Sequence, residues 1–82
     1  MKNREELLDL SYTNKLDWIY NDQYLDIFIE DPSPYVRSCV AERGYGIETL
    51  INDKNIYVHF CVIAYCRNHK EKFKDILMLY NL

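Results

Sequence analysis

The stretch IEDPSPYVRSCV, residues 29–40, is followed 22 residues later by INDKNIYVHFCV, residues 51–62. Both copies carry Ile, Asp, Tyr, Val, Cys and Val at equivalent positions and in the same order. A fixed period of about 20–50 residues is typical of proteins that stack copies of one supersecondary unit. We therefore expect two clear repeats, at about residues 29–50 and 51–72, with degenerate copies at the ends.

Helix signals surround the repeated motif. In the first copy Ser33 is suited to cap a helix and Pro34 to occupy its first position, where a missing N–H costs nothing. Gly44 can adopt the left-handed conformation that ends a helix. The apolar positions between these signals have helical spacing and are Val36, Cys39 and Val40. In the second copy Asn55 takes the place of Ser33 as the cap.

Helices are also expected elsewhere in the chain, and no segment shows the strict alternation of a strand. The expected ranges are residues 4–11, a helix capped by Thr13 or Asn14, and residues 23–30, 47–52, 55–66 and 70–80. The predicted fold class is all-α, a compact right-handed stack of about six or seven short helices. At 82 residues this is a single domain over 1–82, with one small core.

Charge is distributed unevenly along the chain. The net charge is −3, but residues 1–31 are strongly acidic and residues 32–82 slightly basic. An acidic chain is not the default for a duplex-DNA binder, because phosphate neutralisation supplies most non-specific affinity. Six acids of the N-terminal part either meet helix dipoles or face a basic partner: Asp9, Asp17, Asp22, Asp26, Glu30 and Asp31.

The sequence also indicates a compartment. No apolar stretch approaches the roughly 20 residues needed to cross a bilayer, and residues 1–6 turn acidic before any apolar run of signal-peptide length. The three cysteines lie within helical patterns, which fits a reducing environment better than a disulfide framework. We expect a cytoplasmic protein that does not bind membranes.

Residues 31–41, DPSPYVRSCVA, followed by GYGIETL at residues 44–50, resemble the HEAT-like repeats of the leucine-rich-repeat-variant kind. In that family a D-x-x-x-x-V-R-x-x-V-A helix precedes a short helix ending in L-x-x-D. The resemblance covers about residues 25–66, and the second copy departs from it where His59 replaces Arg37 and Ile63 replaces Ala41. Small proteins with such repeats look typical of bacteria and phages. The resemblance implies a curved helical stack that binds proteins, sometimes nucleic acids, and has no catalytic residues.

Cysteine and histidine are the residues of this chain most suited to catalysis or metal binding. Thiolates ligate metals and iron–sulfur clusters, but Cys39 and Cys61 occupy a small apolar core position and Cys66 a helical stripe, so we interpret them as core residues. His59 and His69 are ten residues apart, and no nucleophile and acid accompany them as a triad requires. We expect no enzyme activity, no metal and no cofactor.

The predicted function is a non-catalytic protein–protein interaction module, of a small phage-type or mobile-element protein that binds or inhibits a host protein. Tyrosine combines apolar area with a polar tip and is favoured at interfaces. The repeat-equivalent Tyr35 and Tyr57, together with Tyr45, are therefore the expected partner contacts, along with the varying pair Arg37 and His59. Exposed repeat ends also predict a homodimer, since terminal repeats normally need capping.

The alternative is a nucleic-acid-binding helical repeat protein. Residues 67–74, RNHKEKFK, are rich in basic side chains that could contact phosphate, or that form an ordinary solvated loop. The bases in question are Arg67, Lys70, Lys72 and Lys74.

Overall fold

The computed structural model describes residues 3–81, and over this range the chain forms seven helices and no strand. Residues 1, 2 and 82 of the predicted domain lie outside the description. The fold class is all-α, as predicted. The helices are α1 (Arg4–Leu8), α2 (Tyr12–Tyr20), α3 (Leu25–Phe28), α4 (Pro34–Glu42), α5 (Ile47–Leu50), α6 (Ile56–Asn68) and α7 (Lys74–Leu79).

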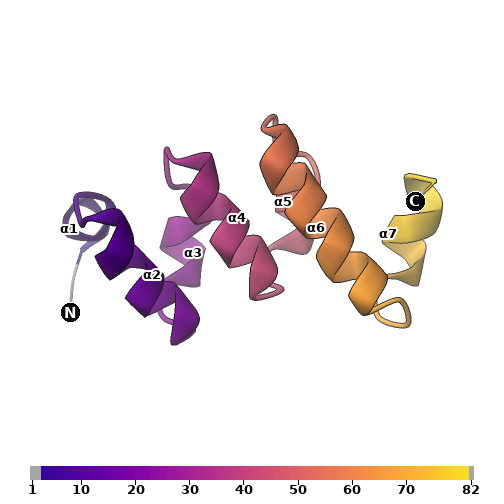
Figure 1. Cartoon of the computed structure of the whole chain (residues 1–82), viewed down its shortest axis with the longest axis horizontal. Helices are drawn as coiled ribbons and strands as arrows, with labels where there is room; N and C mark the ends of the chain where they lie inside the picture. Colours follow the sequence, from indigo (N-terminus) through magenta and orange to yellow (C-terminus); the bar gives the residue numbers. More distant parts are fainter. Residues whose placement is uncertain (1–2, 82) are drawn as a thin grey trace.

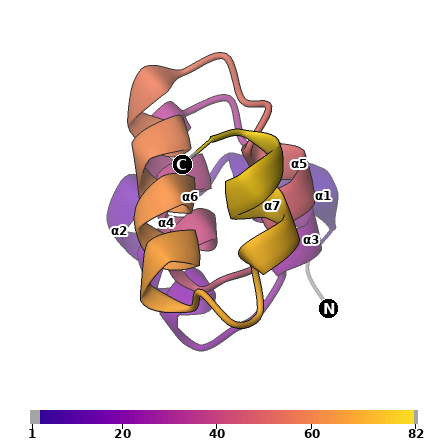
Figure 2. The same ribbon diagram turned by 90° about the vertical axis from the view of Figure 1, so that its right-hand side faces the viewer.

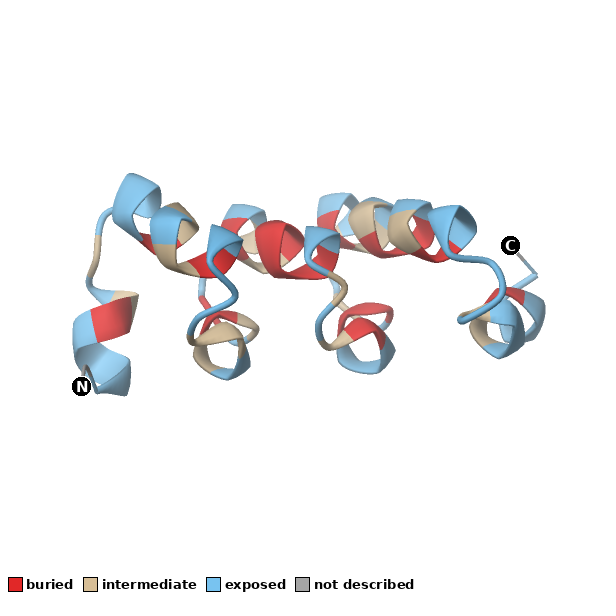
Figure 3. Cartoon of the chain, turned by 90° about the horizontal axis from the view of Figure 1, so that it is seen from below, coloured by how far each residue is buried: buried red, intermediate tan, exposed pale blue. Residues whose placement is uncertain are grey.

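Short and long helices alternate along the chain and separate into two layers (Figures 1 and 2). The long helices α2, α4 and α6 form one layer, and the short helices α1, α3, α5 and α7 form the other. Buried residues lie where the two layers face each other (Figure 3). The molecule is elongated along the direction of stacking, with extents of 39 × 22 × 17 Å.

The 22-residue period of the sequence is also a period of the backbone. Helices α3 and α5 begin 22 residues apart, and so do α4 and α6. Gly44 and Gly46, in the turn before α5, have φ of 77° and 66°. One period earlier Asp22 and Tyr24 both have φ of 58°, although neither is glycine. The repeat therefore extends back to the end of α2.

The helix starts confirm some predicted caps and correct others. Ser33 and Asn55 are the N-caps of α4 and α6, as predicted, and the Asn55 side chain accepts hydrogen bonds from two backbone N–H groups. The prediction for α2 was wrong: its cap is Ser11, whose hydroxyl accepts from the N–H of Asn14. All four short helices are shorter than expected. Helix α1 ends at Leu8 instead of residue 11, and α5 ends at Leu50 instead of residue 52. Helix α3 starts only after the left-handed Tyr24, and residues 70–73 form turns before α7.

One continuous core runs the length of the stack, from Leu7 in α1 to Leu77 in α7. The predicted stripe of the first copy is buried, since Val36, Cys39 and Val40 are all nearly inaccessible. In the second copy Val58 and Val62 are buried, whereas Cys61 is only half-buried.

Two ion pairs join successive repeats, the first buried and the second partly buried. Lys15 Nζ lies 2.8 Å from Asp31 Oδ2, and one period later Arg37 Nε lies 2.7 Å from Asp53 Oδ2. Each aspartate also accepts a bond of 2.9 Å from the backbone N–H two residues ahead, which fixes the start of the following long helix. Asp31, predicted as part of an acidic surface, is therefore a buried structural residue because Lys15 neutralises it. We call these two contacts the inter-repeat ion pairs.

Candidate protein-binding surface

Four exposed tyrosines gather on the outer side of the long helices. Tyr12 and Tyr20 come from the two ends of α2, Tyr35 from the first turn of α4 and Tyr57 from the first turn of α6. Each exposes between 47% and 60% of its surface. We call these four side chains the tyrosine face.

Two of the four tyrosine rings lie against each other, and the other two tyrosines lie near Cys39. The rings of Tyr35 and Tyr57 lie 5.6 Å apart, centroid to centroid. The Tyr12 hydroxyl lies 4.0 Å from Cys39 Sγ. The pKa of Tyr20 is raised, chiefly because ionised Cys39 would repel its phenolate, and the pKa of Tyr57 is raised chiefly by Cys61 in the same way. The tyrosines thus surround two thiols, in an arrangement that offers aromatic area and hydroxyl groups together.

The thiols beneath the tyrosine face are not activated. Burial raises the pKa of Cys39 and Cys61, and it also raises the pKa of Cys66 on the core side of α6. A reactive cysteine needs the opposite shift, because the thiolate is the nucleophile. Over residues 3–81 no three His, Cys, Asp or Glu side chains come together where a metal could bind. The burial of Cys39 and Cys66 agrees with their interpretation as core residues.

The structure separates the predicted partner contacts into two groups. Tyr35 and Tyr57 are brought together, whereas Tyr45 lies beyond the other end of α4, a helix of 9 residues, or about 13 Å. Arg37 is held by Asp53 and donates a further bond of 2.8 Å to the Asp31 carbonyl. His59 is half-buried, with Nδ1 3.0 Å from the Ile51 carbonyl oxygen. Arg37 and His59 are thus occupied by contacts within the chain.

Sequence reasoning did not single out Tyr12 and Tyr20 as surface contacts. Tyr20 has the helical spacing of an apolar stripe with Leu16 and Ile19, yet about half of its surface is exposed. The repeat does not indicate that these two positions carry exposed aromatic residues. The equivalent residues one period later, Pro34 and Glu42, are not aromatic. The spacing of Tyr12 and Tyr20, eight residues apart on one helix, was the available signal.

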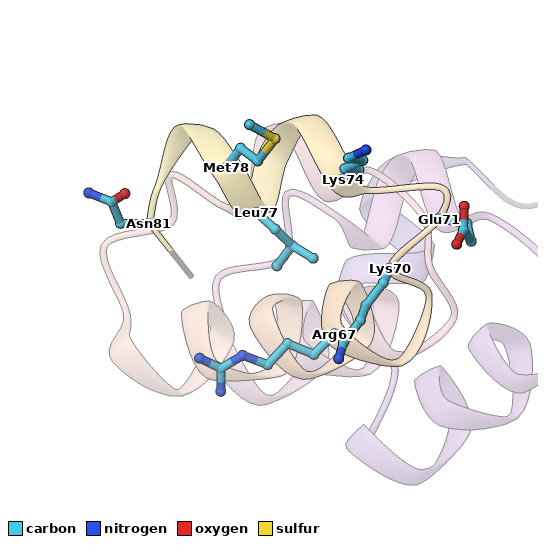
Figure 4. A pocket seen from close by; sticks show the side chains of 7 residues that line it. All are labelled: Arg67, Lys70, Glu71, Lys74, Leu77, Met78 and Asn81. Carbon is cyan, nitrogen blue, oxygen red and sulfur yellow. The ribbon is translucent and has the colours of Figure 1, made fainter.

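The basic segment, residues 67–74, lies at the α7 end of the stack. Arg67, Lys70 and Lys74 line an open pocket of about 780 Å³ between α6 and α7, together with Leu77 and Met78 (Figure 4). Lys72 does not line this pocket, but it lines a second, smaller one together with Arg67 and Lys70, and its Nζ lies 5.4 Å from the centre of the Phe73 ring. The predicted phosphate contacts are therefore brought together around two pockets that share Arg67 and Lys70.

The acidic residues of the N-terminal part do not form one free surface. Asp22 receives two hydrogen bonds from Arg43, of 2.9 and 3.0 Å, and these bonds lower its pKa. Glu30 pairs with Arg4 at 2.9 Å. Asp9, Asp17 and Asp26 are exposed.

No family model matches this chain, and no similar curated protein or solved structure was found. Within residues 3–81, each helix is too short, or too polar, to cross a membrane.

Proposed function

We propose that this chain is a non-catalytic protein-binding module that holds a partner protein against the tyrosine face. The observation that carries the proposal is that four tyrosines of three neighbouring long helices are exposed, with Tyr35 against Tyr57 and Tyr12 beside Cys39. Isolated exposed aromatics are ordinary. A cluster is different, because tyrosine is enriched in the anchors that supply most of the binding energy of protein interfaces.

The scaffold supports this role. Tyr35 and Tyr57 each stand in the first turn of a long helix, and each helix is fixed at that point by an aspartate of an inter-repeat ion pair. Tyrosines on rigid helices lose little conformational entropy on binding, so more of their contact energy appears as affinity. Stacked helical repeats in general offer such extended surfaces to partners.

A pull-down from lysate of the source organism, treated with nuclease, tests the proposal. We expect a protein partner to be captured by the wild-type chain and lost with the double variant Tyr35→Ser/Tyr57→Ser. Loss of more than about 2 kcal/mol, or thirtyfold in affinity, is ordinary when two interface anchors are removed. Tyr45→Ser is the matched control, since it makes the same change outside the tyrosine face.

Capture that disappears on nuclease treatment, and that depends on Lys70 and Lys74 instead of the tyrosines, would show a nucleic-acid binder and refute the proposal. Equal capture by the wild type and the double tyrosine variant would also refute it.

A further inference from the structure

The last long helix, α6, has an apolar stripe that is exposed at Ile56 and Phe60 and buried at Ile63. These three residues and Arg67 follow one another at spacings of four, three and four, which places them on one side of the helix. Ile56 exposes 68% of its surface and Phe60 58%. Large apolar side chains grouped in this way mark interaction surfaces more often than scattered ones do.

The repeat shows what this side of a long helix packs against. One period before Phe60 and Ile63, the equivalent residues of α4 are Ser38 and Ala41, and both are buried. Helix α4 makes its most extensive helix–helix contact with α6. This side of α4 therefore receives the next long helix. The equivalent side of α6 carries the larger Phe60 and Ile63, and Phe60 is exposed.

The charge around the stripe is positive. Arg67 continues the stripe into the pocket that Lys70 and Lys74 also line (Figure 4). None of these three bases takes part in the ion pairs found among residues 3–81. Leu77 and the exposed Met78 of α7 border the same pocket. We call Ile56, Phe60 and Arg67 of α6, with Lys70, Lys74 and Met78, the α6–α7 end face.

We propose that the α6–α7 end face docks an amphipathic helix of a partner protein, one whose apolar stripe is bordered by Asp or Glu. The helix lies beside α6 as α6 lies beside α4, at the end of the stack where α6 and α7 are seen side by side (Figure 2). Its apolar side chains cover Ile56, Phe60 and Met78. Its carboxylates meet Arg67, Lys70 and Lys74. This inference shares the protein-binding character of the proposed function but uses a different surface.

A second copy of the chain fits this face less well. At the α2 end of the stack Asn14 and Asp17 are exposed, at positions where the repeats carry valine and cysteine. That end would place polar groups against Phe60 and leave them poorly hydrogen-bonded. Two α6–α7 end faces brought together would place like charges opposite one another. A nucleic acid would satisfy the bases but leave the apolar stripe uncovered.

Two synthetic 18-residue helical peptides test the proposal. They share a Leu stripe at helical spacing and differ only in the flanking residues, Glu in one and Lys in the other. We titrate each into the ¹⁵N-labelled chain and follow its amide resonances. The Glu peptide should shift residues of α6 and α7 and bind at least about tenfold more tightly than the Lys peptide.

Substitutions locate the contact. Phe60→Ser gives α6 the residue that α4 carries at this position and should weaken binding of the Glu peptide by about tenfold or more. The fold should persist, since Phe60 is exposed, and circular dichroism checks this. Tyr35→Ser, the same kind of change on the tyrosine face, should leave peptide binding unchanged. Lys70→Glu/Lys74→Glu should abolish the preference for the Glu peptide.

Four results would overturn the proposal. Two concern the peptides: equal affinity for both of them, or resonance shifts confined to the tyrosine face. The other two are tighter binding of a single-stranded oligonucleotide than of the Glu peptide, and self-association in sedimentation velocity that Phe60→Ser removes. These outcomes are independent of the pull-down described above, because that experiment depends on Tyr35 and Tyr57.

Discussion

At the scale of single residues, the inter-repeat ion pairs explain where several charged side chains lie. Burial alone would raise the pKa of Asp53, but hydrogen bonds from Arg37 and from the Asn55 N–H outweigh burial and lower it. A carboxylate whose pKa is lowered by folding stabilises the protein above its unfolded pKa, about 3.9. That stabilisation is lost as the pH falls through the lower, folded value.

Asp53→Asn should therefore destabilise the chain most near neutral pH. Arg37 and Asp53 are largely shielded from water, with side-chain exposures of 19% and 11%, so we expect a loss of about 1–3 kcal/mol at pH 7. The difference from wild type should shrink as the pH falls below about 4. Urea denaturation at a series of pH values measures both effects.

Glu30→Gln is the control, because both side chains of the Arg4–Glu30 pair are exposed to solvent. Surface pairs contribute about 0–1 kcal/mol, so this variant should stay close to wild type throughout. A loss as large as that of Asp53→Asn would show that burial does not set the strength of these pairs.

At the scale of elements, the turn before each short helix needs a left-handed backbone. Gly46, the N-cap of α5, has φ of 66°, and a Cβ built on it would collide with Ile29 Cδ1. Tyr24 adopts the same conformation one repeat earlier and packs edge-on against Trp18, with ring centroids 5.1 Å apart. Glycine in the one case and an aromatic anchor in the other thus support the same turn.

Gly46→Ala should cost about 1–3 kcal/mol, since the left-handed conformation alone costs alanine about 1–2 kcal/mol and the contact with Ile29 adds to this. Thermal unfolding followed by circular dichroism measures the change. Thr49→Ala, at an exposed position of α5, is the control and should change stability by no more than about 0.5 kcal/mol. If Gly46→Ala unfolds at the same temperature as the wild type, the turn does not require a glycine.

At the scale of the whole molecule, each repeat packs only on its neighbours, so stability should vary along the stack. Amide hydrogen exchange should be slowest in α4 and α6 and fastest in α1 and α7. Leu77→Ala removes a buried side chain from α7 and should speed exchange there while leaving α2 unchanged. Val40→Ala, in the middle of the core, should speed exchange in every helix. Uniform acceleration by both variants would show a single cooperative unit without end effects.

The sequence predicted the period, the all-α class and the caps of the two clear repeats, because these depend on local spacing and on residues such as Ser33 and Asn55. It did not predict that Asp31 is buried, since its partner Lys15 lies on a different helix. The spacing of 16 residues shared by Lys15–Asp31 and Arg37–Asp53 was the missed signal. The start of α7 was placed at residue 70 because the turns that precede it are as polar as a first helical turn. The tyrosine face could not be predicted fully, since Tyr12 comes to lie beside Cys39, and Tyr35 against Tyr57, only after three helices have packed.

The shared spacing of the inter-repeat ion pairs also sets the units in which this chain can be lengthened. A gene segment duplicated so that residues 32–53 recur after Asp53 would bring its own arginine and its own aspartate, each in register with a neighbour. The added unit would satisfy its buried charges without any change to the helices on either side. An insertion of another length between Arg37 and Asp53 would separate the two and leave a largely shielded charge unpaired, which is destabilising. Whole repeats are therefore the increments of length that this architecture tolerates in evolution and in engineering.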